Sequence, residues 1–207
     1  SYAKHNESPV EEILPIVGIN PEYIYQNEMY KSCKYAEGVK IALQNRLKIK
    51  NILDKHRKEP LSEDWYPASI FCDKCKKDAT KIIGYDNEYQ VDYTCECGNK
   101  DSFDIRKKGI IKLLWRIDWP MRWAYEKVDF ESGGKDHFAA GGSFDTAKEI
   151  IKLFDFEAPS SKRYEWIGIK GGAQFSSSAG NVITVQDDLE IYTPEILRFM
   201  FAGTKIE

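Results

Sequence analysis

Four cysteines give the clearest chemical signal in this sequence. Cys72 and Cys75 are separated by two residues, and Cys95 and Cys97, nineteen residues further on, are separated by one. Structural Zn²⁺ is bound by four ligands in a tetrahedron, and a tight turn between two cysteines supplies two of them. Four thiolates leave no coordination position open, so the pattern predicts a structural zinc ion and not a catalytic one. The alternative is a set of four buried free thiols.

Two glycine pairs flank a histidine. The first segment is Gly133-Gly134-Lys135-Asp136-His137 and the second is Gly141-Gly142-Ser143-Phe144-Asp145. Glycine lets the backbone approach a ligand closely, and a helix that begins after such a loop favours anionic groups. Asp136 or Asp145 suits the hydroxyls of a ribose, and His137 suits a polar ligand. Ordinary glycine turns beside a structural histidine would give the same pattern.

Three tryptophans occur within nine residues, in WRIDWPMRW from Trp115 to Trp123. One interpretation is a core segment with a face of aromatic rings. The other is an aromatic wall beside a charged ligand, with Asp118 available to pair with a cation.

A loop rich in hydroxyl groups follows the apolar run from Tyr164 to Ile169. Its sequence, QFSSSAGN from Gln174 to Asn181, suits neither a helix nor a strand. The segment is therefore predicted to be a flexible loop that follows a strand.

The composition is that of an ordinary globular protein. Of 207 residues, 42% are hydrophobic and 30% are charged. The formal net charge of −3 argues against a uniformly basic nucleic-acid coat. A local basic run from Lys40 to Lys58 is either a solvated helix face or a surface that faces phosphates.

The sequence also indicates a cellular compartment. It opens SYAKHNESPV, without the pattern of a signal peptide, and no apolar stretch approaches the roughly 20 residues that cross a bilayer. An odd number of cysteines disfavours a disulfide framework, and Cys33 is assigned no role. We therefore expect a cytoplasmic protein with no membrane partner.

The first 60 residues have a helical pattern. Asn20-Pro21-Glu22 has the residues of a helix start, which predicts a helix that continues to about Tyr30. Apolar residues at helical spacing predict a longer helix from Tyr35 to Lys58, ended by Pro60.

Strands and helices follow in alternation. Ile82–Tyr85 and Tyr89–Tyr93 are predicted to form a β-hairpin between the cysteine pairs, with Asp86-Asn87 as its turn. From Gly109 onward the α/β arrangement is predicted to contain a strand at Lys127–Glu131, a helix at Phe144–Leu153, a strand at Tyr164–Lys170 and a helix from Thr193 to Gly203.

Taken in order, these segments resemble the class I lysyl-tRNA synthetase family, the archaeal-type enzyme that also occurs in some bacteria. The match covers essentially the whole chain, and its combination of motifs is highly specific although single motifs are not. Besides the cysteine pairs it comprises EMYKS at Glu28, WRIDWPMRW at Trp115, GKDHFAAGGSFDTAKEI at Gly134, YEWIGIKGG at Tyr164 and SSSAGNVITVQD at Ser176.

The resemblance implies an α/β fold, the second half of a class I synthetase Rossmann-type catalytic domain with a helical and zinc-ribbon-like insertion. Residues 1–66 would form the helical part of the connective insertion, and residues 67–108 its zinc-binding module. Residues 109–190 would form the second half of the catalytic domain, with its KMSKS-type loop. Residues 191–207 would begin the following helical region.

The resemblance also implies roles for matching residues. Trp115 and His137 would contact the lysine substrate. The four cysteines would bind the zinc of the insertion, near the acceptor end of the tRNA. The loop that meets ATP or the adenylate matches Gly134, Lys135, Asp136, Gly141, Gly142, Ser143 and Asp145. The KMSKS-type loop, which closes over the ATP phosphates and stabilises developing charge, matches Gln174, Phe175, Ser176, Ser177 and Ser178.

The sequence departs from the family pattern in two ways. Gln174 and Ser177 stand where the loop motif has lysines, and Ala179 replaces a further lysine. A slower activation step is therefore expected, unless Lys170 or a residue elsewhere compensates. The H-x-G-H-type signature is absent, so we expect an internal fragment that lacks this motif and the anticodon-binding region.

The implied function is ATP-dependent activation of lysine and its attachment to tRNA(Lys). The full-length protein would be a lysine–tRNA ligase with ATP, L-lysine and tRNA(Lys) as partners, Mg²⁺ accompanying ATP and Zn²⁺ in a structural role. The isolated fragment would be inactive. Two alternatives are a non-catalytic zinc-containing RNA-binding module and a class I synthetase of other amino-acid specificity.

Overall fold

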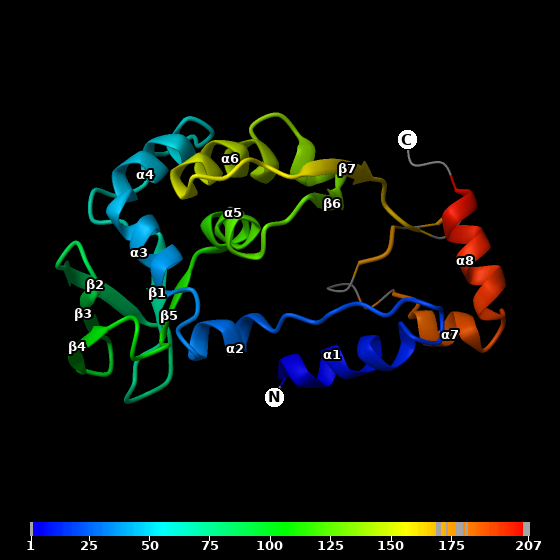
Figure 1. The fold of residues 1–207 in the computed structure, drawn as a ribbon, viewed down its shortest axis with the longest axis horizontal. Coiled ribbons are helices and arrows are strands. Elements are labelled where there is room, and N and C mark those ends of the chain that lie inside the picture. Colours follow the sequence, from blue (N-terminus) through cyan, green and yellow to red (C-terminus); the bar gives the residue numbers. More distant parts are fainter. Residues whose placement is uncertain (1, 169–170, 173, 177–179, 181, 205–207) are drawn as a thin grey trace. The chain divides into compact units, whose positions relative to one another are not determined.

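The computed structural model describes residues 2–168, 171–172, 174–176, 180 and 182–204. The chain divides into two compact units, of which unit 1 comprises Ser1–Tyr23 and Arg163–Glu207 and unit 2 comprises Ile24–Lys162. Helices and short strands occur together along the chain (Figure 1), which confirms a mixed α/β composition.

A three-stranded antiparallel sheet follows the first cysteine pair in unit 2 (Figure 1). Strand β2 (Thr80–Tyr85) pairs with β3 (Gln90–Cys95), which confirms the predicted hairpin. In its turn the Asp86 carboxylate accepts hydrogen bonds from the backbone N–H groups of Glu88 and Gln90. Strand β4 (Lys100–Asp104) adds a third strand, which the sequence pattern does not predict.

The helix predicted from Tyr35 to Lys58 is in fact two helices. They are α3 (Ala36–Gln44) and α4 (Arg46–Asp54), separated by Asn45 at φ −96° and ψ 18°. The Asn45 side-chain amide donates a hydrogen bond to the Ile41 carbonyl at 2.9 Å. The side chain shares this carbonyl with the Asn45 backbone N–H, and asparagine favours such local hydrogen bonds over a continuous helix.

The helix predicted from Asn20 to Tyr30 is also wrong over most of its length. Only α2 (Gln26–Lys31) is helical there, and residues 20–25 lie outside any helix. Tyr25 is extended, with φ −88° and ψ 107°. Aromatic and β-branched residues such as Tyr23, Ile24 and Tyr25 favour extended backbone over the helix that Pro21 alone suggests.

The tryptophan-rich segment forms helix α5 (Trp115–Glu126) in unit 2. Strand β5 (Ile111–Leu113) leads into it and pairs with β1 (Ala68–Ile70). Trp123 is only 1% exposed whereas Trp115 is 52% exposed. One face of α5 is therefore core, as the first interpretation holds, and another face carries an aromatic ring to the surface.

After α5 the chain forms a strand, a helix and a strand. Lys127 has a left-handed φ of 55° that ends α5, so β6 (Phe130–Gly134) begins three residues later than predicted. The connection contains η1 (Lys135–Phe138), α6 (Ser143–Ile150) and η2 (Ile151–Phe154), which confirms the predicted helix.

The strand predicted at Tyr164–Lys170 is wrong in position. Strand β7 (Ser160–Tyr164), the neighbour of β6, ends where that prediction begins. The backbone N–H of Ser160 donates to the Asp129 carbonyl at 2.9 Å, and this tertiary contact starts the strand early. Ile169 and Lys170 lie outside the described residues.

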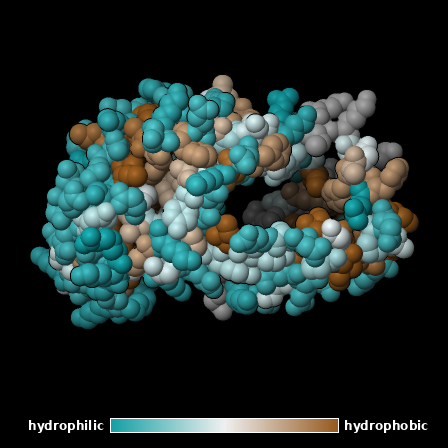
Figure 2. Space-filling model, in the orientation of Figure 1, coloured by the Kyte–Doolittle hydropathy of each residue, from teal (hydrophilic) through white to brown (hydrophobic). Residues whose placement is uncertain are grey.

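Unit 1 contains α1 (Tyr2–Ile13), α7 (Val185–Leu189) and α8 (Pro194–Gly203), the last of which confirms the predicted C-terminal helix. In the described part of this unit, Val17 and Leu197 are the buried hydrophobic residues, and Phe199 is 77% exposed. Figure 2 shows hydrophobic residues at the surface of this unit, while the surface over β2–β4 is mostly hydrophilic. Among the described helices, none is long and apolar enough to cross a membrane.

Candidate functional site

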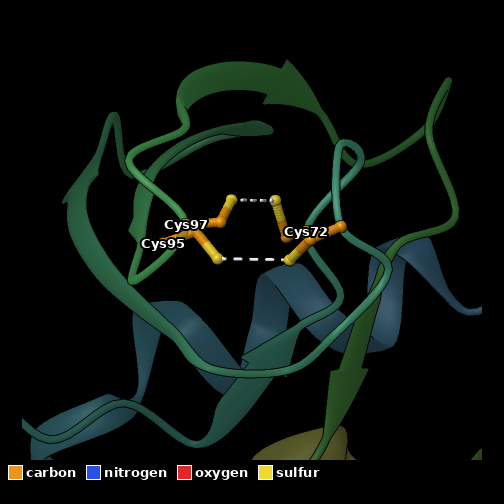
Figure 3. A group of neighbouring side chains, drawn as sticks. Cys72, Cys95 and Cys97 are labelled. Carbon is orange, nitrogen blue, oxygen red and sulfur yellow. Dashed lines mark hydrogen bonds between the residues drawn. The ribbon is translucent and has the colours of Figure 1, made fainter.

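The four cysteines converge from two loops (Figure 3). Their sulfur atoms all lie within 4.8 Å of one another, with 3.7 Å between Cys72 and Cys97 and 3.6 Å between Cys75 and Cys95. Zn–S bonds of about 2.3 Å in a tetrahedron place sulfurs about 3.8 Å apart, so the four atoms are compatible with that ion. A disulfide bond, at about 2.05 Å, is far shorter than these separations.

Each cysteine pair lies on a turn that backbone hydrogen bonds hold. In the first turn the Lys76 N–H donates to the Cys72 carbonyl at 2.8 Å. In the second the Gly98 N–H donates to the Cys95 carbonyl at 2.9 Å, with Gly98 at a φ of 84° that suits glycine. Because this second turn joins β3 to β4, the sheet itself positions two of the four sulfur atoms.

The thiols differ in acidity. Burial would raise the pKa of Cys72, but the backbone N–H groups of Cys75 and Lys74 outweigh it and lower that pKa to about 6. The backbone N–H of Cys97 acts to lower the pKa of Cys95, but burial and the neighbouring sulfurs raise it to about 12. A bound divalent cation is what would let all four thiols ionise together.

A second group of predicted residues meets where α5 approaches η1. The His137 ring centroid lies 6.1 Å from that of Trp115 and 5.7 Å from that of Trp119. His137 Nδ1 lies 2.8 Å from the hydroxyl of the buried Ser143, which leaves Nε2 as the nitrogen for a ligand. The structure thus brings together the two residues predicted to contact lysine, and it adds Trp119.

Glu131 on β6 supports this aromatic group, and sequence reasoning misses it. One of its carboxylate oxygens accepts hydrogen bonds from the indole N–H of Trp123 at 2.8 Å and of Trp119 at 3.3 Å. The carboxylate therefore fixes the orientation of two rings beside His137. No local pattern marks an acidic residue in a strand as the partner of tryptophans in the preceding helix.

The suggestion that Asp118 is available to a cationic ligand is wrong. Asp118 is 5% exposed, and its carboxylate accepts hydrogen bonds from the Tyr30 hydroxyl and from Arg122 Nε, the latter at 3.0 Å. Burial, together with the charge of Asp118, raises the pKa of Tyr30, so the phenol stays protonated and donates. Asp118 therefore joins α2 to α5.

The glycine loop is shaped by backbone geometry. Gly141 has a left-handed φ of 71°, and its N–H donates to the Asp145 carboxylate at 3.1 Å. A Cβ atom on Gly142 would lie 2.7 Å from the carbonyl oxygens of Ala139 and His137. Of the other residues predicted to meet ATP, Gly134 ends β6, and Lys135 and Asp136 are exposed on η1.

The described part of the QFSSSAGN loop belongs to unit 1, whereas Trp115 and His137 belong to unit 2. Gln174 forms a β-bridge with Gly168, and the Phe175 N–H donates to the Ile167 carbonyl at 3.0 Å. The half-buried Ser176 follows. The remaining predicted residues of this loop, Ser177 and Ser178, lie outside the described residues.

The basic run has internal partners at several positions. Lys40 pairs with Glu88 at 2.6 Å, Lys50 pairs with Asp54 at 2.9 Å, and Lys55 pairs with Glu149 at 2.6 Å. These three charges are neutralised within the fold, which argues against the whole run as a surface for phosphates.

Comparison with known proteins identifies the family of the chain. The family model described as tRNA synthetases class I (K) matches residues 1–207. Proteins named lysine–tRNA ligase are similar to 99% of this chain, at 54% identity in Borreliella burgdorferi, 46% in Treponema pallidum and 46% in Thermococcus kodakarensis. The chain spans 40% of the length of each of these relatives. The chain therefore belongs to the family of class I tRNA synthetases of the lysine (K) type.

Proposed function

We propose that the protein containing this chain is a lysine–tRNA ligase, which activates lysine with ATP and attaches it to tRNA(Lys) in the cytoplasm. The observation that carries this proposal is the family match over residues 1–207, with relatives that bear this name at up to 55% identity. The contact between Trp115 and His137 supports it, because an aromatic ring and an imidazole with a free nitrogen suit a cationic amino acid.

The chain would supply the second half of a Rossmann-type catalytic domain, with a helical and zinc-ribbon-like insertion. The strand, helix and strand from β6 to β7 support the first assignment, and the three-stranded sheet beside the cysteines supports the second. In this proposal residues 1–66 are the helical insertion, 67–108 the zinc module, 109–190 the catalytic half and 191–207 the next helical region.

Zinc would be held by Cys72, Cys75, Cys95 and Cys97, where it would link the two turns and supply structure rather than catalysis. Two of its ligands would come from the loop between β1 and β2 and two from the turn between β3 and β4, so it would fix the end of the sheet that the family resemblance places near the tRNA acceptor end. Mg²⁺ would arrive with ATP.

In the reaction, the lysine carboxylate attacks the α-phosphate of ATP in line and pyrophosphate leaves. A hydroxyl of the terminal tRNA ribose then attacks the carbonyl of the adenylate, and AMP leaves. Trp115 and His137 would position the lysine, and the glycine loop from Gly134 to Asp145 would approach the adenylate. Gln174 to Ser178 would face the phosphates with hydroxyl and N–H groups in place of lysines.

The test is lysine-dependent ATP–pyrophosphate exchange by the full-length protein, with tRNA present and absent. His137→Ala should raise KM for lysine by about tenfold or more, because a hydrogen bond to a charged group contributes about 1.5–3 kcal/mol. His5→Ala, which changes an exposed histidine in unit 1, is the matched control.

Two results would contradict the proposal. Absence of exchange under both conditions would favour a zinc-containing RNA-binding module. Exchange with an amino acid other than lysine would favour a synthetase of other specificity.

A further inference from the structure

A small pocket in unit 2 is lined by basic side chains from separate segments. His56 and Arg57 follow the end of α4, Arg116 lies on α5, and Gly141 precedes α6. Leu53 and Thr146 complete the lining, and the cavity has a volume of about 170 Å³. Only the folded chain brings these residues together, since they come from three regions of the sequence.

The charge of this pocket is not neutralised by its surroundings. No acidic residue is among its lining residues, and within the described part of the chain neither Arg57 nor Arg116 forms an ion pair. Arg57 donates from Nε to the Glu59 carbonyl at 3.2 Å, which leaves its two terminal nitrogens as donors. The Arg116 guanidinium lies 5.0 Å from the centroid of the Trp115 ring, which orients it without neutralising it.

Three carboxylates lie near the pocket, and each already pairs with a lysine. Asp145 accepts a hydrogen bond from the Gly141 N–H at 3.1 Å and lies 3.5 Å from Lys148 Nζ, and Asp54, next to Leu53, pairs with Lys50 at 2.9 Å. Glu149 is 4.0 Å from His56 Nε2, but its other oxygen pairs with Lys55 Nζ at 2.6 Å. Arg57 and Arg116 therefore give the lining of this cavity an excess of positive charge, and His56 adds a polar ring.

The size of the pocket limits what it can hold. Pockets for drug-sized ligands measure about 300–1,000 Å³, so about 170 Å³ admits a small group and not a whole nucleotide. Close packing sets this size, because a Cβ atom on Gly141 would lie 2.7 Å from His56 Nδ1. Glycine at position 141 therefore allows the loop backbone to pack directly against the His56 imidazole.

Two other cavities among the described residues of unit 2 lack this charge. The cavity lined by Arg46, Glu63, Asp64 and Lys81 contains an internal ion pair between Lys81 and Asp64. The cavity beside Phe156 has Lys152 but two acidic residues, Asp155 and Glu157.

We propose that the pocket formed by His56, Arg57, Arg116 and the Gly141 loop binds one phosphate group of the tRNA backbone. Guanidinium groups match phosphate oxygens with two parallel hydrogen bonds, and two arginines line this one cavity. A phosphate of the RNA backbone can enter the pocket while its ribose and bases stay outside, and a free phosphate compound such as pyrophosphate is the other source that the test separates from it. This inference rests on the proposed function, which makes tRNA a substrate.

The test measures the dissociation constant of a tRNA(Lys) transcript for the full-length protein over a series of salt concentrations. Arg57→Gln should weaken binding by about fivefold or more and lower the slope of log K against log salt by about one, as for the loss of one phosphate contact. The double variant Arg57→Gln/Arg116→Gln should also lower the slope by about one in total, because both residues hold the same phosphate.

The control is Lys48→Gln, which removes an exposed positive charge on α4 outside the pocket and should leave the slope within the error of the wild type. Arg57→Lys keeps the positive charge but lacks the planar guanidinium group. Its salt slope should match that of the wild type, and its affinity for tRNA should lie between those of the wild type and Arg57→Gln. Circular dichroism melting of each variant separates loss of binding from loss of folding.

The outcomes distinguish the two proposals. A wild-type protein that activates lysine, while Arg57→Gln binds tRNA with an unchanged slope, would overturn the pocket assignment alone. If the protein lacks exchange activity but its tRNA binding depends on Arg57, the proposed ligase function is wrong and the pocket assignment stands. If Arg57→Gln weakens binding of inorganic pyrophosphate and not of tRNA, the source is a free phosphate compound and the RNA assignment is wrong.

Discussion

At the scale of single residues, Cys97 offers the cleanest test of the proposed zinc site. It is the most exposed of the four cysteines, so its replacement removes a ligand without opening a cavity. Cys97→Ser should reduce bound zinc, measured by mass spectrometry, from about one equivalent to a small fraction of that value, because the remaining three ligands bind far more weakly.

The same variant should lose stability. A decrease of about 3 kcal/mol in the free energy of unfolding corresponds to a decrease in Tm of roughly 6–12 °C for a chain of this size. Cys33→Ser, outside the cluster, is the control and should keep its zinc. Full zinc occupancy in Cys97→Ser would show that the ion is not held by these four thiolates.

A second residue-scale prediction concerns acid stability. The Arg106 side chain, with help from its backbone N–H, lowers the pKa of Asp104 to about 2, whereas the pKa of an ordinary aspartate is about 3.9. The unfolded state therefore binds more protons between these values. The stabilising effect is complete above about pH 4 and is lost as pH falls toward 2.

Arg106→Gln should therefore make stability decrease less steeply as pH falls. The measurement is the urea midpoint of unfolding between pH 5 and pH 2. Lys100→Gln on β4 removes the same charge without contacting Asp104, and zinc loss at low pH affects all variants alike. The prediction would be contradicted if the urea midpoint depended on pH in the same way in the Arg106 and Lys100 variants.

Sequence reasoning could select candidate site residues that belong to local motifs. The cysteine pairs are recognisable because each lies within one turn, and Trp115 and His137 follow from the motifs that carry the family resemblance. Glu131 and Asp118 could not be assigned in this way. Their roles depend on which helix packs against which strand, and no spacing in the sequence encodes that.

At the scale of elements, Gly109 marks where the connection from β4 to β5 crosses the end of α2. A Cβ atom there would lie 2.3 Å from the carbonyl oxygen of Tyr30 and 2.5 Å from the Cα of Lys31. Backbone atoms cannot rotate away as a side chain can, so Gly109→Ala should lower the free energy of unfolding by about 3 kcal/mol, the upper end of the usual effect of overpacking.

Urea denaturation of the variant measures this loss. Gly203→Ala, at the end of α8 with no atom within 4 Å of the new methyl group, is the matched control and should change stability by less than about 1 kcal/mol. Equal effects of the two substitutions would contradict the close approach.

Elements with strong local signals were predictable. The hairpin has its turn residues and α8 has Thr193-Pro194 at its start, and Thr184 and Asp187 form a capping box that would also have located α7. The errors arose where local signals compete. Asn45 carries the only sign of the break between α3 and α4, and β7 begins at a position that its contact with Asp129 determines.

At the scale of the whole molecule, the two units differ in how much core they contain. The buried hydrophobic residues of the described chain belong almost entirely to unit 2, where they include Tyr35, Val39, Tyr93 and Ile117. Segments with few buried contacts open locally at low free-energy cost. Hydrogen exchange should therefore show strong protection in α3, β3 and α5, and weak protection in α1, α7 and α8.

Mass spectrometry of the 207-residue protein after timed deuterium labelling tests this difference. Measurement of the full-length protein is the informative control, because exposed residues such as Phe199 and Phe201 offer apolar surface for further packing there. Equal protection of the two units in the isolated chain would contradict the prediction.

The sheet beside the cysteines has a consequence for synthesis. Strands β2, β3 and β4 are consecutive and pair only with their sequence neighbours, and both turns that carry the sulfurs lie within residues 72–97. A nascent chain emerges from the ribosome N-terminus first, and contacts between near neighbours form fastest. This meander, with the proposed zinc ion, can therefore form before α5 has left the ribosome, so that α5 emerges next to a sheet that is already closed.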